Sequence, residues 1–438
     1  MLLDIATSNF RVFASEAGLS FVNPSLKTQT PKPPQTWESS TYRVAAVYGA
    51  NASGKSTLLD ALQTLAHAVA NPGHTLYAPH AQASADLPTT YDVNFTRTGI
   101  RYHYTVEAMP WGIRSEVLHA YPKGTSRLLF QRTQQSADTP IEVKSGPSLT
   151  GPTAEVKRLL TATDLLLAVA SRYQHKTLAP VSQGLRAGTS IASVNRSDQS
   201  TEDWVQWIIS RLIENPKRWQ GIVKALAHMA DLGISDVRVQ EEQIPPEVLE
   251  RMRALLAVGS DDLSTQIPDD ALPSVVRLLV FTHSDNEGRT FDLGLGAQST
   301  GTLTWLTTAG PAVNAIARGD LLVVDELDAS LHPTLAAAMV RMFKDPDINT
   351  TGAQILFSTH DTSLLGNAPS KVLAPGEVWF CEKHGTSSEV FSLADFDTRA
   401  SNNEQKRYLT GRFGALPDVD FSRVMEAIDI ARAPQTAG

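Results

Sequence analysis

The sequence predicts an α/β fold in which a parallel sheet is combined with an antiparallel β subdomain and an α-helical insertion. Near its start, the apolar run 43–48 leads through a glycine-rich loop into apolar residues at helical spacing. Near its end, strand 321–324, helix 333–343 and strand 354–358 follow in the order of parallel α/β units. Residues 91–121 alternate between apolar and polar side chains, which predicts antiparallel strands.

The composition is that of a folded protein and excludes several functional classes. The chain has 438 residues, room for about two or three domains, with 42% hydrophobic and 19% charged residues. A net charge of -8 argues against a protein that coats nucleic acid by bulk electrostatics, although it leaves room for a local basic face. The single cysteine, Cys381, allows neither an internal disulfide nor a paired-cysteine zinc site.

The N-terminal region predicts two short strands followed by an exposed loop. Residues 2–22 alternate in polarity, and residues 23–40 are rich in Pro, Thr and Ser. The two apolar runs contain Phe10, Val12 and Phe13, and then Leu19, Phe21 and Val22. The start lacks the pattern of a secretory signal, and no apolar segment approaches the roughly 20 residues of a membrane helix. We therefore expect a cytoplasmic protein with no membrane partner.

The glycine-rich loop matches the pattern G-x-x-x-x-G-K-[ST], in which small residues let backbone N–H groups curl around phosphate oxygens. Lys55 would reach the β- and γ-phosphates of ATP, and Ser56 would bind Mg²⁺. A chance glycine-rich turn is the alternative, and the strand before and the helix after the loop argue against it. The predicted nucleotide-binding residues are Gly49, Asn51, Ala52, Ser53, Gly54, Lys55, Ser56 and Thr57.

A pair of acidic residues follows the apolar run 321–324, where a buried strand would deliver them to the ligand edge of the sheet. Asp325 would hold the metal through water, and Glu326 would polarise the water that attacks the γ-phosphate. Taken alone, two acids after a strand are more often an ordinary strand end. The phosphate loop earlier in the chain favours the catalytic interpretation.

Three segments divide the chain on these grounds. Residues 1–150 form an N-terminal ATPase lobe, residues 151–258 a helical insertion, and residues 259–438 a C-terminal ATPase lobe. Within the insertion, proline and glycine break the helical runs and heptads are not sustained, so we expect no long coiled coil. The segment 259–272 is acidic and rich in turn residues, which predicts a surface loop.

These motifs resemble the ABC-type ATPase heads of chromosome-maintenance, recombination-repair and overcoming-lysogenization proteins. DELDASLHP resembles their Walker B motif and D-loop, which implies a D-loop role for Asp328. FSTHD resembles their switch-histidine motif, which implies that His360 senses the γ-phosphate, although a lone histidine after a strand is more often structural. The fold that this resemblance implies is a P-loop NTPase of the ABC-type head class.

The resemblance also implies a signature motif that acts in trans on the nucleotide of a second chain. QSTGT, with Ser299 and Gly301, stands just ahead of a predicted helix and fits this place, although it departs from the LSGGQ of transporter subunits. The glutamine of the Q-loop stays open among Gln131, Gln134 and Gln135.

Within the class, the chain resembles the ATPases of abortive-infection and phage-defence operons of the RloA or AbiL type along most of its length. Segments such as LLLAVASRYQH and YLTGRFGALP carry this likeness. It implies a homodimer or higher homo-oligomer that sandwiches ATP and Mg²⁺ and acts as sensor, scaffold or regulator of a separate effector, such as a nuclease. The alternative is a DNA repair or recombination ATPase that acts directly on nucleic acid.

A nuclease domain within the chain itself has little room, because fewer than 80 residues follow His360. Two Asp-x-Asp pairs lie there, Asp395 with Asp397 and Asp418 with Asp420. We interpret both as solvated turns.

Overall fold

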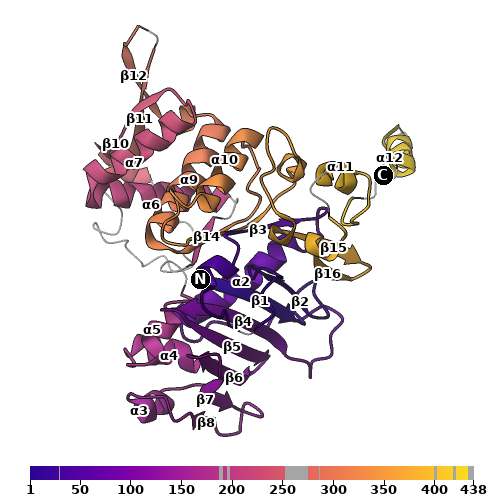
Figure 1. The fold of residues 1–438 in the computed structure, drawn as a ribbon. Helices are drawn as coiled ribbons and strands as arrows, with labels where there is room; N and C mark the ends of the chain where they lie inside the picture. Colours follow the sequence, from indigo (N-terminus) through magenta and orange to yellow (C-terminus); the bar gives the residue numbers. More distant parts are fainter. Residues whose placement is uncertain are drawn as a thin grey trace, which may run out of the picture. The chain divides into compact units, whose positions relative to one another are not determined.

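The computed structural model describes residues 1–28, 30–186, 191–194, 198–251, 275–285, 287–398, 402–417 and 421–432 (Figure 1). These residues form two compact units. The first unit is Met1–Ser193, Ala315–Leu327 and Val340–Gly438, and the second is Val194–Asn314 and Asp328–Met339. The predicted acidic loop 259–272 lies outside the described residues, and so do Asp418 and Asp420.

An antiparallel sheet of seven strands in the first unit has the order β2-β1-β4-β5-β6-β7-β8. The strands are β1 (Leu2–Ser8), β2 (Ala17–Ser20), β4 (Thr89–Arg97), β5 (Ile100–Met109), β6 (Gly112–Tyr121), β7 (Arg127–Thr133) and β8 (Glu142–Ser145). Buried and partly exposed residues alternate along β5, so one face of the sheet packs on the core. The antiparallel strands predicted within 91–121 are confirmed as β4, β5 and β6.

The second sheet of the first unit is mostly parallel, with the order β16-β15-β3-β14-β13-β9. Its strands are β3 (Val44–Tyr48), β9 (Ile191–Val194), β13 (Leu321–Val324), β14 (Gln354–Ser358), β15 (Val378–His384) and β16 (Ser387–Ser392). Strands β3, β13 and β14 are buried at every residue, as expected for parallel strands covered on both faces. The predicted α/β order is therefore confirmed, with β16 as an antiparallel addition.

The N-terminal prediction was wrong at residues 9–13, because this stretch turns instead of continuing as a strand. Phe10 and Phe13 exchange backbone hydrogen bonds of 2.9 and 2.8 Å, and Asn9 and Arg11 adopt positive φ angles of 47° and 50°. Both phenylalanine side chains are nevertheless buried. The turn therefore buries in the core the same apolar residues whose pattern suggested a strand. Further along, the predicted loop contains the short helix α1 (Trp37–Ser40).

Three helices of the core lie close to their predicted positions: α2 (Lys55–Ala70), α9 (Thr300–Arg318) and α10 (Pro333–Lys344). The sequence pattern did not predict the C-terminal helices α11 (Glu404–Leu409) and α12 (Phe421–Arg432). It also did not predict the short 3-10 helices η1 (Leu295–Ala297), η2 (Thr362–Leu365), η3 (Pro375–Glu377) and η4 (Leu393–Asp395). Among the residues that the structure describes, no helix is long and apolar enough to cross a membrane.

Three more helices of the first unit pack beside the antiparallel sheet: α3 (Thr153–Arg158), α4 (Leu166–Arg172) and α5 (Leu178–Ser182). The fully buried carboxylate of Glu116 on β6 accepts hydrogen bonds from the backbone N–H groups of Leu166 (2.6 Å) and Leu167 (3.0 Å). It also accepts one from the hydroxyl of Tyr104 at 2.8 Å. Burial raises the pKa of Glu116, while these three donors favour its charged form. Glu116 therefore ties the sheet to the start of α4.

The second unit combines helices with a three-stranded antiparallel sheet, β10-β11-β12. Its elements include α6 (Asp198–Glu214), α7 (Pro216–Met229), β10 (Ile234–Gln243), β11 (Val275–Ser284) and β12 (Thr290–Gly294). The predicted helical insertion, residues 151–258, was wrong at β9 and β10, which are strands. Helix α7 ends at Met229, and Asp231 and Gly233, with φ of +52° and +68°, turn the chain into β10. Buried and exposed residues alternate irregularly along β10, so its sequence does not stand out from the helical pattern before it.

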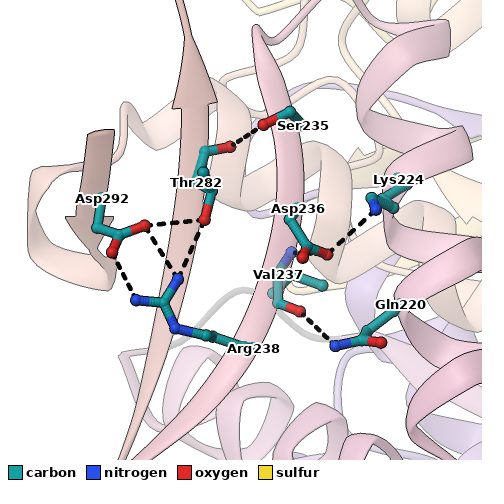
Figure 2. A network of polar contacts seen from close by, with 8 residues as sticks. All are labelled: Gln220, Lys224, Ser235, Asp236, Val237, Arg238, Thr282 and Asp292. Atoms are coloured by element: carbon teal, nitrogen blue, oxygen red, sulfur yellow. Dashed lines mark hydrogen bonds and ion pairs between the residues drawn. The ribbon is translucent and has the colours of Figure 1, made fainter. Parts of the chain in front are cut away.

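Polar contacts hold this small sheet together and fasten it to α7 (Figure 2). Arg238 on β10 donates to both carboxylate oxygens of Asp292 on β12, at 2.9 and 2.5 Å, and to the hydroxyl of Thr282 on β11 at 3.1 Å. On the α7 side, Lys224 pairs with Asp236 at 3.4 Å, and Gln220 donates to the backbone oxygen of Val237 at 3.2 Å. One arginine therefore connects all three strands.

Candidate active site

The phosphate loop predicted from the sequence joins β3 to α2. Gly54 has φ of +107° and Ala52 has φ of +59°, so the chain turns sharply before α2 begins at Lys55. The Lys55 side chain is only 6% exposed, and its Nζ donates to the backbone oxygens of Gly49 and Ala50, both at 3.0 Å. The loop thus curls around the ammonium group, in front of the N–H groups that begin the 16-residue helix α2.

Strand β15 packs against the back of this loop. The thiol of Cys381 donates to the backbone oxygen of Ser53 at 2.9 Å. Burial raises the pKa of Cys381 to about 12, so at neutral pH the thiol keeps the proton that this bond requires. As a single cysteine, Cys381 excluded a disulfide and a paired-cysteine zinc site, but no sequence signal marks its contact with a segment 328 positions away.

The approach of β15 leaves no room for a side chain at Gly49. A Cβ atom there would lie 2.3 Å from the backbone oxygen of Cys381. We predict that Gly49→Ala displaces the loop and weakens binding of a fluorescent ATP analogue about tenfold or more, because the backbone donors of the loop would no longer converge. Gly99→Ala is the matched control, since Gly99 also has positive φ (+76°) but has nothing within 4 Å of an added Cβ. Equal affinity in the two variants would contradict the role of the phosphate loop in nucleotide binding.

The two acidic residues after β13 lie at the same edge of the sheet as the phosphate loop. The Ser56 hydroxyl donates to Asp325 Oδ1 at 3.0 Å, and the Ser358 hydroxyl donates to the same oxygen at 2.5 Å. The N–H of Glu326 donates to the Ser358 oxygen at 2.7 Å, and Glu326 has φ of +53°. The Glu326 side chain is exposed. A positive φ at a residue other than glycine is a strained conformation that is common at functional sites.

Ser358, at the end of β14, is a site residue within the FSTHD segment for which the sequence predicted no role. It contacts both acidic residues, since it donates to the Asp325 carboxylate and accepts from the backbone N–H of Glu326. Its backbone oxygen also accepts from the N–H of Leu327 at 2.9 Å. The only available signal was a small hydroxyl residue at the end of a buried strand.

The oxygens of Ser56 and Asp325 fit a magnesium ion. Mg²⁺ prefers hard oxygen ligands and usually keeps several waters, so it is bound by few protein groups, directly or through water. The Ser56 hydroxyl and Asp325 Oδ1 are 3.0 Å apart beside the phosphate loop. This donor set is therefore suited to a metal ion that is held partly by the protein and partly by phosphate oxygens.

The loop after β14 brings His360 to the same sheet edge. Strand β14 pairs in parallel with β3 up to Ser358 and Val47, and the Thr359 N–H donates to the Val47 backbone oxygen at 3.1 Å. The imidazole of His360 is exposed at the end of this strand. The adjacent parallel strands β3, β14 and β13 thus deliver the phosphate loop, His360 and the Asp325–Glu326 pair to one edge, where ligands bind in such sheets.

The predicted signature and D-loop residues belong to the second unit. Ser299 caps α9, since its hydroxyl accepts from the Thr302 N–H at 3.1 Å and its backbone oxygen accepts from the Leu303 N–H at 3.1 Å. The Ser299 side chain is exposed. A Cβ atom at Gly301 would lie 3.2 Å from the backbone oxygen of Ser330, so the start of α9 packs closely on the loop that follows Asp328.

One of the three Q-loop candidates has a structural role. The side chain of Gln134 is buried and donates to the backbone oxygens of Ala137 (3.3 Å) and Thr139 (3.0 Å), which closes the turn after β7. The assignment of the Q-loop glutamine therefore stays open, with Gln131 and Gln135 as the less constrained candidates.

The sequence of this chain matches one family model. The family model described as AAA domain, putative AbiEii toxin, Type IV TA system matches residues 44–183 and 208–366, more than half of the chain. Among curated proteins, none has a matching sequence. Similar solved structures include the SMC head domain from Thermotoga maritima, with 12% identity, coverage of 89% of this chain and 98% of that chain, and a TM-score of 0.41.

A second solved structure is the Smc head domain with an extended coiled coil, bound to the C-terminal domain of ScpA and derived from Pyrococcus furiosus. It is 10% identical, covers 99% of both chains and has a TM-score of 0.36. The two segments matched by the family model contain the phosphate loop, both acidic residues and His360. Together with the sheet order, the family match confirms the predicted P-loop NTPase fold.

Proposed function

Given that this chain belongs to the family described as AAA domain, putative AbiEii toxin, Type IV TA system, we propose that it binds ATP and Mg²⁺ and hydrolyses ATP to ADP and phosphate. The observation that carries the proposal is the chain of contacts from Ser56 to Asp325 to Ser358 beside the phosphate loop. A hydroxyl in the first turn of a helix, a carboxylate and an exposed glutamate just after a strand are groups that phosphoryl transfer from a nucleotide can use.

Each residue has a distinct task in this proposal. Lys55, held by two backbone oxygens, would exchange them for the more strongly charged β- and γ-phosphate oxygens. Ser56 and Asp325 would hold Mg²⁺, which when bound neutralises charge on the phosphate groups. Glu326 would accept a hydrogen bond from the attacking water and orient it, and His360 would contact the γ-phosphate.

Release of inorganic phosphate from ATP by the purified full chain tests this function. We expect turnover with Mg²⁺ and its loss when EDTA removes the metal. Binding of a fluorescent ATP analogue, measured in parallel, separates a protein that binds without turning over from one that does not bind. A well-folded chain that binds no nucleotide in the presence of Mg²⁺ would refute the proposal.

We further propose that two copies close around ATP. Ser299 presents a hydroxyl and the N-terminal end of α9 on an exposed surface, and such a helix terminus favours an anion. In the closed pair, Ser299 and Gly301 of one chain would face the γ-phosphate bound by the other, and Asp328 would lie in the D-loop between them. ATP binding would then favour the closed assembly, and hydrolysis would release it.

The biological role that fits best is regulation of a separate effector, such as a nuclease, in bacterial defence against phage, as in ATPases of the RloA or AbiL type. The family description, which names a putative toxin of a toxin–antitoxin system, supports a defence role. Direct action on DNA is the second candidate. A DNA affinity that falls steeply with salt would favour it, whereas the net charge of -8 favours a protein partner.

A further inference from the structure

We propose that the hydroxyl of Tyr48 positions the loop that carries His360, and that helix α11 holds the other end of the same loop. This inference rests on the proposed function, because it assigns these contacts to the hydrolysis step. Tyr48 is fully buried and directly precedes Gly49, the first residue of the phosphate loop. Its hydroxyl donates to the backbone oxygen of Asp361 at 3.0 Å.

Two hydrogen bonds from β3 flank His360 on either side. Before it, the N–H of Thr359 donates to the backbone oxygen of Val47 at 3.1 Å. After it, the backbone oxygen of Asp361 accepts from the Tyr48 hydroxyl. The backbone of His360 is thus fixed at both neighbours to consecutive residues of the strand that leads into the phosphate loop. A displacement of β3 would therefore displace the residues on both sides of His360.

Helix α11 contacts the far end of this loop. Gln405 donates from Nε2 to the Thr362 hydroxyl at 3.2 Å, and its Oε1 would lie 3.0 Å from a Cβ atom at Gly366. Tyr408, also on α11, packs its ring on that of Tyr48, with centroids 5.9 Å apart. One short helix therefore contacts both the loop and the tyrosine that anchors it.

Packing alone does not require the Tyr48 hydroxyl, because phenylalanine would fill the same space. The Tyr48 ring packs among the aromatic rings of Phe380 (6.3 Å) and Tyr408 (5.9 Å), where a hydroxyl that lacked a partner would be costly. The Asp361 backbone oxygen supplies an acceptor. Replacing Tyr48 with phenylalanine therefore removes the hydrogen bond to the loop and keeps the packing of the ring.

Tyr48→Phe is the decisive variant, and Tyr91→Phe is its matched control. Tyr91 is also buried, and its hydroxyl donates to the backbone oxygen of Leu76 at 2.9 Å, so its bond touches neither the His360 loop nor α11. In single-turnover assays with ATP and Mg²⁺, we expect Tyr48→Phe to slow hydrolysis about three- to tenfold, the effect of losing one hydrogen bond. The dissociation constant of a fluorescent ATP analogue should stay within about twofold of wild type, and Tyr91→Phe should retain the wild-type rate.

The outcomes separate this inference from the proposed function. If the wild-type chain does not hydrolyse ATP, the proposed function fails. If the wild-type chain hydrolyses ATP and Tyr48→Phe matches its rate, the loop anchor is refuted. It is also refuted if both tyrosine variants lose the same activity and the same thermal stability, since the effect would then come from packing. Should Tyr48→Phe not fold, Gln405→Ala decides, with slower hydrolysis at unchanged nucleotide affinity expected and an unchanged rate refuting the anchor.

Discussion

Replacing Lys55 with alanine is expected to abolish detectable nucleotide binding. The ammonium group is almost completely buried and lies where the phosphate loop curls back on itself. Its hydrogen bonds to phosphate oxygens would be charge-assisted, so losing two of them should weaken binding by at least about a hundredfold. Titration of a fluorescent ATP analogue in the presence of Mg²⁺ measures this loss.

Lys157→Ala is a suitable control for that titration. Lys157 also donates to a backbone oxygen, that of Val143 at 2.7 Å, but it lies on α3 and belongs to no part of the site. It should retain wild-type affinity. If Lys55→Ala binds the analogue as tightly as Lys157→Ala, the phosphate loop is not the nucleotide site.

Glu326→Gln is expected to keep ATP binding and lose hydrolysis. Glutamine has the size of glutamate and leaves the backbone bond to Ser358 in place, but it cannot act as a base toward the attacking water. The single-turnover rate should fall by about a hundredfold or more. Because ATP would persist in the site, the variant should also accumulate as an ATP-dependent self-associated species, which light scattering after size-exclusion chromatography would detect.

The control for this variant is Glu107→Gln on β5, where the carboxylate makes a partly exposed pair with Arg114 at 2.9 Å. It should hydrolyse ATP at the wild-type rate. A Glu326→Gln protein that turns over ATP normally would remove Glu326 from the reaction. One that binds ATP but never changes its assembly state would contradict closure around the nucleotide.

The central part of the fold could be predicted because its strands have an unambiguous sequence pattern. Strand β13 coincides with the apolar run 321–324, and β14 has the bounds predicted around the apolar residues 355–357, since strands buried on both faces have continuous apolar runs. Strand β10 and the turn at residues 9–13 could not be predicted. At β10 a helix would bury the same apolar residues as the strand, and at residues 9–13 a strand would bury the same apolar residues as the turn. Only tertiary packing decides which structure forms.

The proposed site divides in the same way. Lys55, Ser56 and Asp325 could be brought together in advance, because parallel strands expose their carboxyl ends at one edge. The supporting contacts of Ser358, Cys381 and Tyr48 could not. Each joins segments that are far apart in the sequence, and the last two join segments more than 300 positions apart. Such contacts depend on the register of the finished sheet, which single-sequence patterns do not specify.

A mixing experiment tests most directly whether the site is completed by a second chain. Lys55→Ala disables the phosphate loop, and Ser299→Arg blocks the exposed N-terminal end of α9. Each variant alone should therefore be inactive in ATP hydrolysis. A mixed pair contains one complete site, formed by the phosphate loop of the Ser299→Arg chain and Ser299 of the Lys55→Ala chain. Equimolar mixing should therefore restore up to about a quarter of the wild-type rate, as random pairing of two chains predicts. No recovery at any mixing ratio, or full activity of Ser299→Arg by itself, would contradict a site shared between two copies.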